Sequence, residues 1–214
     1  MRQVAYLALA ALLCVPFVLP SGFAVSVAVS TLFTAYLAQA WNIAGGYGGL
    51  TSFGHAVFFG TGAYVSTIFQ LRYGFNPWLG LPLGAASGAL VGWIIGHLSF
   101  RAGLRGSYFA LVTLAFAEAF RILANSIEIT RGGLGMLIRL DTRLANFQFA
   151  DRRAWYLVVL LLCALAFGIA LWLERSRFGA RLMALRENED AARALGVDVL
   201  ATKVRALAIS GALT

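Results

Sequence analysis

The feature that most constrains this chain is the near absence of charge from its first hundred residues. Only Arg2 and Arg72 are charged there, and the first acidic residue is Glu118. A soluble domain covers its surface with polar side chains, and about a quarter of its residues are usually charged. This chain is 12% charged and 60% hydrophobic. These values exclude a soluble cytosolic enzyme, a disordered protein and a secreted disulfide scaffold, and they predict an integral membrane protein.

Long apolar runs predict the fold class. A helix needs about 20 mostly apolar residues to cross about 30 Å of hydrocarbon. Six runs fit this length, at about 4–20, 23–44, 54–71, 79–99, 106–125 and 154–173, and a seventh begins near Arg205. We therefore expect one all-α domain over residues 1–214, a polytopic transmembrane helix bundle of about six complete spans. Because the seventh run is too short to span, we expect a C-terminally truncated piece of a longer protein.

The basic residues predict the orientation of the bundle. Short cytoplasmic loops of membrane proteins carry an excess of Lys and Arg. Bases flank the loop at 101–105 and fill the segment 174–205. With six spans, these two regions and Arg2 lie on one side, so we expect a cytoplasmic N-terminus and an outer 126–153 segment. Because the bases lie between apolar runs, the net charge of +8 favours contact with membrane lipid over nucleic acid.

A glycine-rich stretch separates the second run from the third. Non-helical backbone at membrane depth survives only where protein or a water-filled cavity satisfies its polar groups. Such interrupted helices often mark transport sites, although a plain tight cytoplasmic turn has the same composition. Thr51 and Ser52 also suit the N-cap of the following helix. The candidate residues for a translocation path here are Gly48, Gly49, Thr51, Ser52, Gly54 and His55.

Glycines also recur at every fourth position in the fourth run, at Gly84, Gly88, Gly92 and Gly96. This spacing places them in one stripe on a helix. Small residues let two helix backbones approach closely in a membrane, so the stripe predicts tight helix packing. A groove that lines a pore is the alternative.

Two charged residues lie deep in the fifth run. Glu118 and Arg121 are three positions apart, so they share a helix face and can pair. An ionisable group at this depth usually faces protein or a water-filled cavity. The pair is therefore either structural or part of the translocation path.

The segment 174–205 holds the densest charge. Apolar residues recur there at helical spacing, at Leu182, Leu185, Ala192 and Leu195. Charged residues occupy the other faces, at Arg186, Glu187, Glu189, Asp190 and Arg193. We expect a short amphipathic helix-turn-helix on the cytoplasmic face, in which Gly196 ends the helix and Asp198 and Lys203 follow before the next span. It either lies on lipid headgroups or docks a cytoplasmic partner.

The segment 174–205 and three further stretches together resemble a known family. Asp190-Ala191-Ala192, followed after three residues by Gly196, resembles the E-A-A-x-x-x-G coupling loop of ATP-binding-cassette importer permeases, with Asp in place of Glu. The remaining stretches resemble branched-chain amino-acid permeases, and their order resembles the M-type of the two permease subunits. They are Gly48 to Ala56 with Gly62-Ala63-Tyr64, Leu104 to Ala110 with Thr113-Leu114, Thr130 to Gly135, and Arg175 to Glu189.

The resemblance implies a multi-pass subunit of a bacterial inner-membrane importer. Its expected partners are a second permease subunit, two cytoplasmic ATPases and a periplasmic substrate-binding protein. Arg186, Glu187, Glu189, Asp190, Ala191, Ala192 and Gly196 would contact the ATPase. The family also includes urea and amide importers.

Other functions remain open at this point. The sequence has no G-x-x-x-x-G-K-[S/T] phosphate loop, so we expect a non-catalytic subunit with no cofactor and no metal. A stand-alone secondary carrier would use Glu118 as its coupling group. An intramembrane enzyme would use Ser52 or His55, but no acidic residue lies nearby to orient the histidine.

Overall fold

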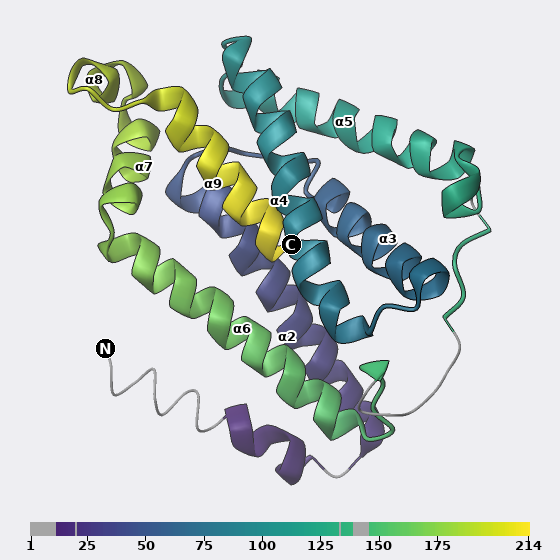
Figure 1. Ribbon diagram of the computed structural model, residues 1–214. Coiled ribbons are helices and arrows are strands. Elements are labelled where there is room, and N and C mark those ends of the chain that lie inside the picture. Colours follow the sequence, from purple (N-terminus) through teal and green to yellow (C-terminus); the bar gives the residue numbers. More distant parts are fainter. Residues whose placement is uncertain (1–11, 20, 133, 139–145) are drawn as a thin grey trace.

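The computed structural model describes residues 12–19, 21–132, 134–138 and 146–214. All regular secondary structure in these ranges is helical, so the all-α prediction is confirmed (Figure 1). The long helices are α2 (Gly22–Asn42), α3 (Ala56–Tyr73), α4 (Pro77–Arg101), α5 (Gly106–Ser126) and α6 (Arg152–Arg175). The shorter ones are η1 (Ile43–Tyr47), η2 (Glu128–Thr130), α7 (Arg177–Glu187), α8 (Glu189–Ala194) and α9 (Val199–Leu213).

Local sequence explains where these helices begin and end. The side chains of Ser21, Asn76 and Asp151 cap α2, α4 and α6 by accepting hydrogen bonds from backbone N–H groups. Pro77 occupies the first turn of α4, where its missing N–H costs nothing. Gly74 ends α3 with a φ of 66°, a left-handed conformation that glycine adopts without strain.

Among the described residues, four helical stretches are long and apolar enough to cross a membrane. They are Gly22–Tyr47, Pro77–Arg101, Gly106–Ser126 and Arg152–Arg175. The chain is thus a multi-pass helical membrane protein, and the count of six spans stays a prediction. The predicted third span corresponds to α3, which is not among these four. Most of the predicted first span lies outside the described residues, although residues 12–18 are helical.

Three helix pairs make the closest packing in the bundle. Helix α4 packs along its neighbour in sequence, α3, and along α9, and α2 packs along α6. The pairs α4–α9 and α2–α6 are far apart in sequence but side by side in space (Figure 1). Val25 and Leu32 of α2 meet Tyr156 and Leu160 of α6 in one buried cluster. A larger cluster joins the residues after α2 to α3, α4, α7 and α9.

The last helix begins earlier than expected. Helix α9 starts at Val199, after the side chain of Asp198 accepts a hydrogen bond from the N–H of Ala201. Lys203, expected in the loop before the seventh span, is therefore inside the helix, and it is buried. The capping aspartate explains the difference, because it fixes a helix start that hydropathy alone places later.

Candidate functional site

The glycine-rich stretch after α2 is a real interruption of the helix. The α-helix gives way to the π-helical turn η1, and the backbone then leaves helical geometry until α3 begins. Gly49 has a φ of 63°, which L side chains rarely adopt. The indole Nε1 of Trp41 donates a hydrogen bond of 3.0 Å to the carbonyl oxygen of Ser52. Protein groups thus satisfy polar backbone here, as an interruption of a membrane helix requires.

A buried hydrogen-bond chain joins this break to α2 and α9. Ser210 donates through Oγ to the carbonyl oxygen of Ala40 at 2.6 Å. Its single proton is then used, so Nε2 of His55 is the donor in the 2.8 Å contact with Ser210 Oγ. That assignment leaves Nδ1 of His55 as an acceptor. Nδ1 is buried without a hydrogen-bond partner, and so is Oγ of Ser52.

The break also packs directly against α5. The backbone N–H of Phe53 donates to Oγ1 of Thr113 at 3.1 Å. A Cβ added to Gly54 would lie 2.0 Å from the carbonyl oxygen of Thr113, so only glycine fits there. Thr51 is exposed, and His55, rather than Thr51 or Ser52, is the N-cap of α3 and makes no side-chain cap bond. The predicted Thr51 or Ser52 cap is therefore wrong, because the backbone after both residues is irregular and the helix begins only at Ala56.

The charged segment before Gly196 is divided into two helices at Asn188. Asn188 has extended backbone between α7 and α8, and its side chain accepts from the N–H groups of Asp190 and Ala191. Leu182, Leu185 and Ala192 are buried as expected, but Leu195 is 85% exposed. The break at Asn188 changes the helical phase, which is why the predicted single apolar face fails at Leu195. Gly196 follows α8 with a φ of 83°, as a C′ glycine does.

Helix α7 lies directly on the glycine break. The Leu182 side chain comes within 3.0 Å of where a Cβ of Gly48 would stand, and the Arg186 stem is as close to Gly49. Nη1 of Arg186 donates a hydrogen bond of 3.0 Å to the carbonyl oxygen of Gly46. The same guanidinium pairs with Glu187 at 2.7 Å. Two features that are some 140 residues apart in sequence thus form one structural unit.

Glu189 is the electrostatic centre of this unit. Its carboxylate pairs with Nζ of Lys203, with Nε of Arg105 at 3.3 Å and with Nη2 of Arg193 at 3.3 Å. The side chains of Glu189 and Lys203 are only 15% and 7% exposed. Lys203 Nζ also lies 5.4 Å from the centre of the Phe100 ring. One carboxylate therefore ties α8 to α9 and to the residue that precedes α5.

The other acidic residues of the segment face outward. Asp190 is 73% exposed and makes looser contacts with Arg105 and Arg193 at 3.5 and 3.4 Å. Glu187 is 70% exposed. Ala191 is exposed, whereas Ala192 is buried against Leu185 and Val199. The residues expected to contact an ATPase thus divide into an outer set and an inner set, with Glu189 in the inner one.

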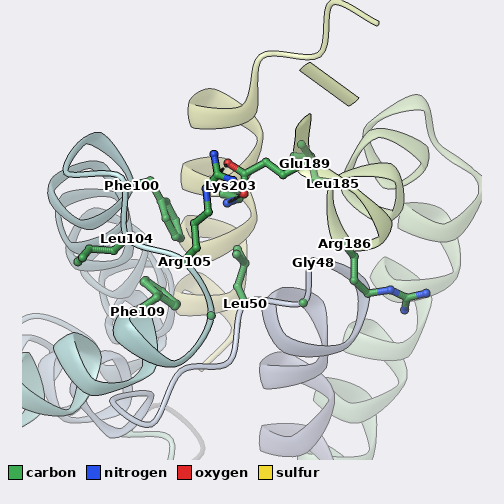
Figure 2. Close-up of a pocket in the computed structure, with 12 residues that line it drawn as sticks. Gly48, Leu50, Phe100, Leu104, Arg105, Phe109, Leu185, Arg186, Glu189 and Lys203 are labelled. Atoms are coloured by element: carbon green, nitrogen blue, oxygen red, sulfur yellow. Dashed lines mark hydrogen bonds and ion pairs between the residues drawn. The ribbon is translucent and has the colours of Figure 1, made fainter. Parts of the chain in front are cut away.

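A pocket opens between the break, α7–α8 and the start of α5 (Figure 2). Its volume is about 240 Å³. Charged groups of Glu189, Lys203 and Arg105 gather on one side of it. Apolar side chains line the rest of the pocket, from Leu50, Phe100, Leu104, Phe109 and Leu185. The guanidinium of Arg186 points away from the pocket, toward Gly46 and Glu187.

The glycine stripe of α4 meets two different neighbours. A Cβ on Gly88 would lie 2.2 Å from the carbonyl oxygen of Gly211, and one on Gly92 would lie 2.7 Å from that of Leu207. Gly96 packs beside Leu207 and Val204 with slightly more room. Gly84 instead faces Gly62 of α3. The stripe therefore brings both α9 and α3 close to α4.

Glu118 and Arg121 form a two-point ion pair on the exposed side of α5. Nη2 of Arg121 lies 2.6 Å from Oε1 of Glu118, and Nε lies 2.9 Å from Oε2. Neither residue reaches the break or α7–α8 through any described hydrogen bond or ion pair. The structure thus separates this pair from the other candidate path residues.

Four residues of the site were not singled out by sequence reasoning. Arg105, Thr113, Lys203 and Ser210 each hold one element against another. Arg105 and Thr113 lie in or beside a stretch that carried the family resemblance, and the charge of Lys203 just before the last apolar run was a further indication. Ser210 gave none, because small hydroxyl residues are common in membrane helices and often bond to their own backbone.

Within the described ranges, no three His, Cys, Asp or Glu side chains are grouped as metal ligands. Both cysteines, Cys14 and Cys163, are free.

Comparison with known proteins identifies the relatives of this chain. Residues 23–214 match the family described as branched-chain amino acid transport system / permease component. The high-affinity branched-chain amino acid transport system permease proteins LivM of Salmonella typhimurium and Escherichia coli are each 33% identical to it. Both alignments cover 92% of this chain and 51% of the relative. The chain therefore spans about half the length of these relatives.

A more distant relative comes from an archaeon. The probable branched-chain amino acid transport permease protein LivM of Methanocaldococcus jannaschii is 26% identical over 80% of this chain and 59% of its own length. No solved structure matches the chain.

Proposed function

Since the chain belongs to the branched-chain amino acid transport permease family, we propose that it is a permease subunit of an ATP-driven importer. Its substrates are branched-chain or related hydrophobic amino acids. It forms the translocation path with a second permease subunit in a bacterial inner membrane. Two cytoplasmic ATPases supply the energy, and a periplasmic binding protein delivers the substrate. The subunit itself is non-catalytic.

The contact between Arg186 and Gly46 is the observation that carries this proposal. It joins the α7–α8 segment to the interrupted helix through a 3.0 Å hydrogen bond. In the proposed assembly the outer face of this segment, with Glu187, Asp190 and Ala191, binds the ATPase. A displacement of the segment would then move the break, because Leu182 and Arg186 lie against Gly48 and Gly49. Packed elements move together rather than deform continuously.

The break is the proposed wall of the path. Oγ of Ser52 and Nδ1 of His55 are buried and unpaired, which is costly unless a water or a ligand group meets them during transport. The glycines of the break let the backbone approach a passing substrate closely. On this assignment the end of the bundle that carries α7 and α8 faces the cytoplasm, which agrees with the excess of arginine in that segment.

Reconstitution tests the proposal. The full-length protein is assembled with its second permease, ATPases and binding protein in proteoliposomes, and uptake of radiolabelled leucine, isoleucine and valine is measured with and without ATP. We expect ATP-dependent uptake of these amino acids. Uptake of urea or short amides instead would place the protein in another branch of the family. Uptake without ATPase, driven by a proton gradient, would refute the importer.

Association with the ATPase is tested separately. We expect co-purification with the ATPase for the intact protein and loss of it when residues 186–196 are replaced by a glycine-serine linker of equal length. A replacement of residues 127–132, at the opposite end of α5, serves as the control. Unchanged association after replacement of 186–196 would overturn the docking assignment.

A further inference from the structure

We propose that the pocket between the break and the α7–α8 segment binds the transported amino acid on its way into the cytoplasm. This inference rests on the proposed function, because the pocket has this role only if the chain imports amino acids. The ligand is a zwitterion with a branched aliphatic side chain. The pocket is lined by both moving parts of the proposed transporter, the break at Gly48–Leu50 and α7–α8 at Leu185–Glu189.

The apolar walls suit an aliphatic side chain. Leu50 and Leu185 line the pocket from the break and α7, and Phe100, Leu104 and Phe109 line it from α4, the loop and α5 (Figure 2). Leu50 and Leu185 are buried, and Phe109 is almost completely so. Burial of one CH₂ group in such walls is worth about 0.8 kcal/mol. A branched side chain of four carbons therefore gains enough for weak but selective binding.

The charged side of the pocket matches both ends of a zwitterion. Two cations, Arg105 and Lys203, and one carboxylate, Glu189, gather there. Arg105 is half-exposed and its contacts with Glu189 and Asp190 are 3.3 and 3.5 Å long, so its guanidinium has donors to spare for an incoming carboxylate. Glu189 can accept a hydrogen bond from the ammonium group. A ligand that carries only one of these charges would leave either Arg105 or Glu189 without a ligand group to bind.

The size of the pocket limits the ligand to a small molecule. About 240 Å³ is below the roughly 300–1,000 Å³ of pockets that hold drug-sized ligands. The position also explains why binding should be weak. A site at the exit must release the amino acid, so tight binding there would slow transport.

Saturation-transfer NMR on the purified full-length protein, without binding protein, tests the assignment with three probes. Leucine carries both charges, isocaproate lacks the ammonium group, and isoamylamine lacks the carboxylate. We expect leucine to bind at least about tenfold more tightly than either analogue, a difference of about 1.4 kcal/mol, because each analogue lacks one of the two charges. Isocaproate binding as tightly as leucine would overturn the role of Glu189 and with it the zwitterion site.

Two variants locate the binding. Leu104→Trp fills the pocket from the loop, and Arg105→Gln removes a half-exposed cation at little risk to folding. We expect both to weaken leucine binding at least about tenfold. Leu98→Trp is the matched control. Leu98 lies six residues before Leu104 and is exposed on α4, so this variant should leave leucine binding unchanged. Unchanged binding in Leu104→Trp and Arg105→Gln, or equal loss in Leu98→Trp, would overturn the site.

An anionic lipid headgroup is the competing occupant. Short-chain phosphatidylglycerol is added to the leucine-bound protein, and we expect no displacement. Displacement of the leucine by this lipid would assign the pocket to lipid and overturn the proposal. The importer and the site also fail separately. ATP-dependent leucine uptake with no leucine binding here would leave the importer standing and overturn the site, whereas binding here without any uptake would refute the importer and leave only an amino-acid-binding pocket.

Discussion

Arg186 of α7 donates a hydrogen bond of 3.0 Å to the backbone carbonyl of Gly46, in the π-helical turn where α2 ends. The carbonyl belongs to a turn whose backbone has left the α-helical pattern, so a side chain from a distant segment completes its hydrogen bonding. The arginine stem also lies against Gly49, which has positive φ and no room for a Cβ. A surface segment thus holds the interruption of a membrane helix in place.

The buried pair of Glu189 and Lys203 predicts a large loss of stability when one partner is removed. Glu189→Gln leaves the buried Lys203 ammonium, which lies beside the Phe100 ring, without its charged partner. Breaking a buried ion pair in this way typically costs about 3–5 kcal/mol. We expect a clear drop in apparent melting temperature of the full-length protein in detergent. The double variant Glu189→Gln with Lys203→Met should recover much of the loss, because no buried charge then remains unpaired.

Glu187→Gln is the matched control for this prediction. It changes the same residue type nearby, but Glu187 is 70% exposed and its ion pair with Arg186 lies at the surface. Surface pairs contribute about 0–1 kcal/mol. Equal destabilisation by Glu187→Gln and Glu189→Gln would contradict the burial of Glu189.

Close packing of α4 on α9 predicts a steric penalty at Gly88. In Gly88→Ala the new Cβ would lie 2.2 Å from the carbonyl oxygen of Gly211, so one helix must shift. Overpacking of this kind typically costs about 1–3 kcal/mol. Gly168→Ala in α6 is the control, since nothing lies within 4 Å of its new Cβ. Alanine favours the helix there by about 0.5–1 kcal/mol, so we expect opposite shifts in melting temperature for the two variants.

The ion pair on α5 predicts that a charge exchange is tolerated. Glu118→Gln leaves Arg121 without its partner in an apolar helix, so we expect reduced yield and reduced uptake. Exchange of the two residues, Glu118→Arg with Arg121→Glu, restores a pair at the same spacing. We expect this double variant to recover ATP-dependent uptake to within about twofold of the parent, a difference of roughly 0.4 kcal/mol. Full loss in the exchanged variant would favour a coupling role for Glu118.

Much of the fold followed from the sequence because hydropathy reports burial in lipid directly. The bounds of α4, α5 and α6 lie within about two residues of the apolar runs, because proline, glycine and charged residues mark their ends. The start of α9 did not follow, since its early turns carry polar residues that hydropathy assigns to a loop. Likewise, nothing in the helical spacing shows that Asn188 divides α7 from α8.

The site was predicted in its parts but not in its assembly. Glycine content located the break, and charge located the α7–α8 segment. Their contact depends on long-range packing of Leu182 and Arg186, which leaves no periodic trace in the sequence. The inward orientation of Glu189 was missed for the same reason, because its partners Arg105 and Lys203 come from different elements.

The number of leucine molecules imported for each ATP hydrolysed tests the link between the α7–α8 segment and the break most directly. It is measured in proteoliposomes for the parent, for Arg186→Ala and for the control Glu187→Gln, which keeps the bond to Gly46. We expect Arg186→Ala to retain its ATPase subunits and to hydrolyse ATP within about twofold of the parent rate, yet to import at least about tenfold less leucine per ATP. Glu187→Gln should match the parent. An unchanged ratio in Arg186→Ala would contradict the proposal that this contact carries the movement from the ATPase to the membrane.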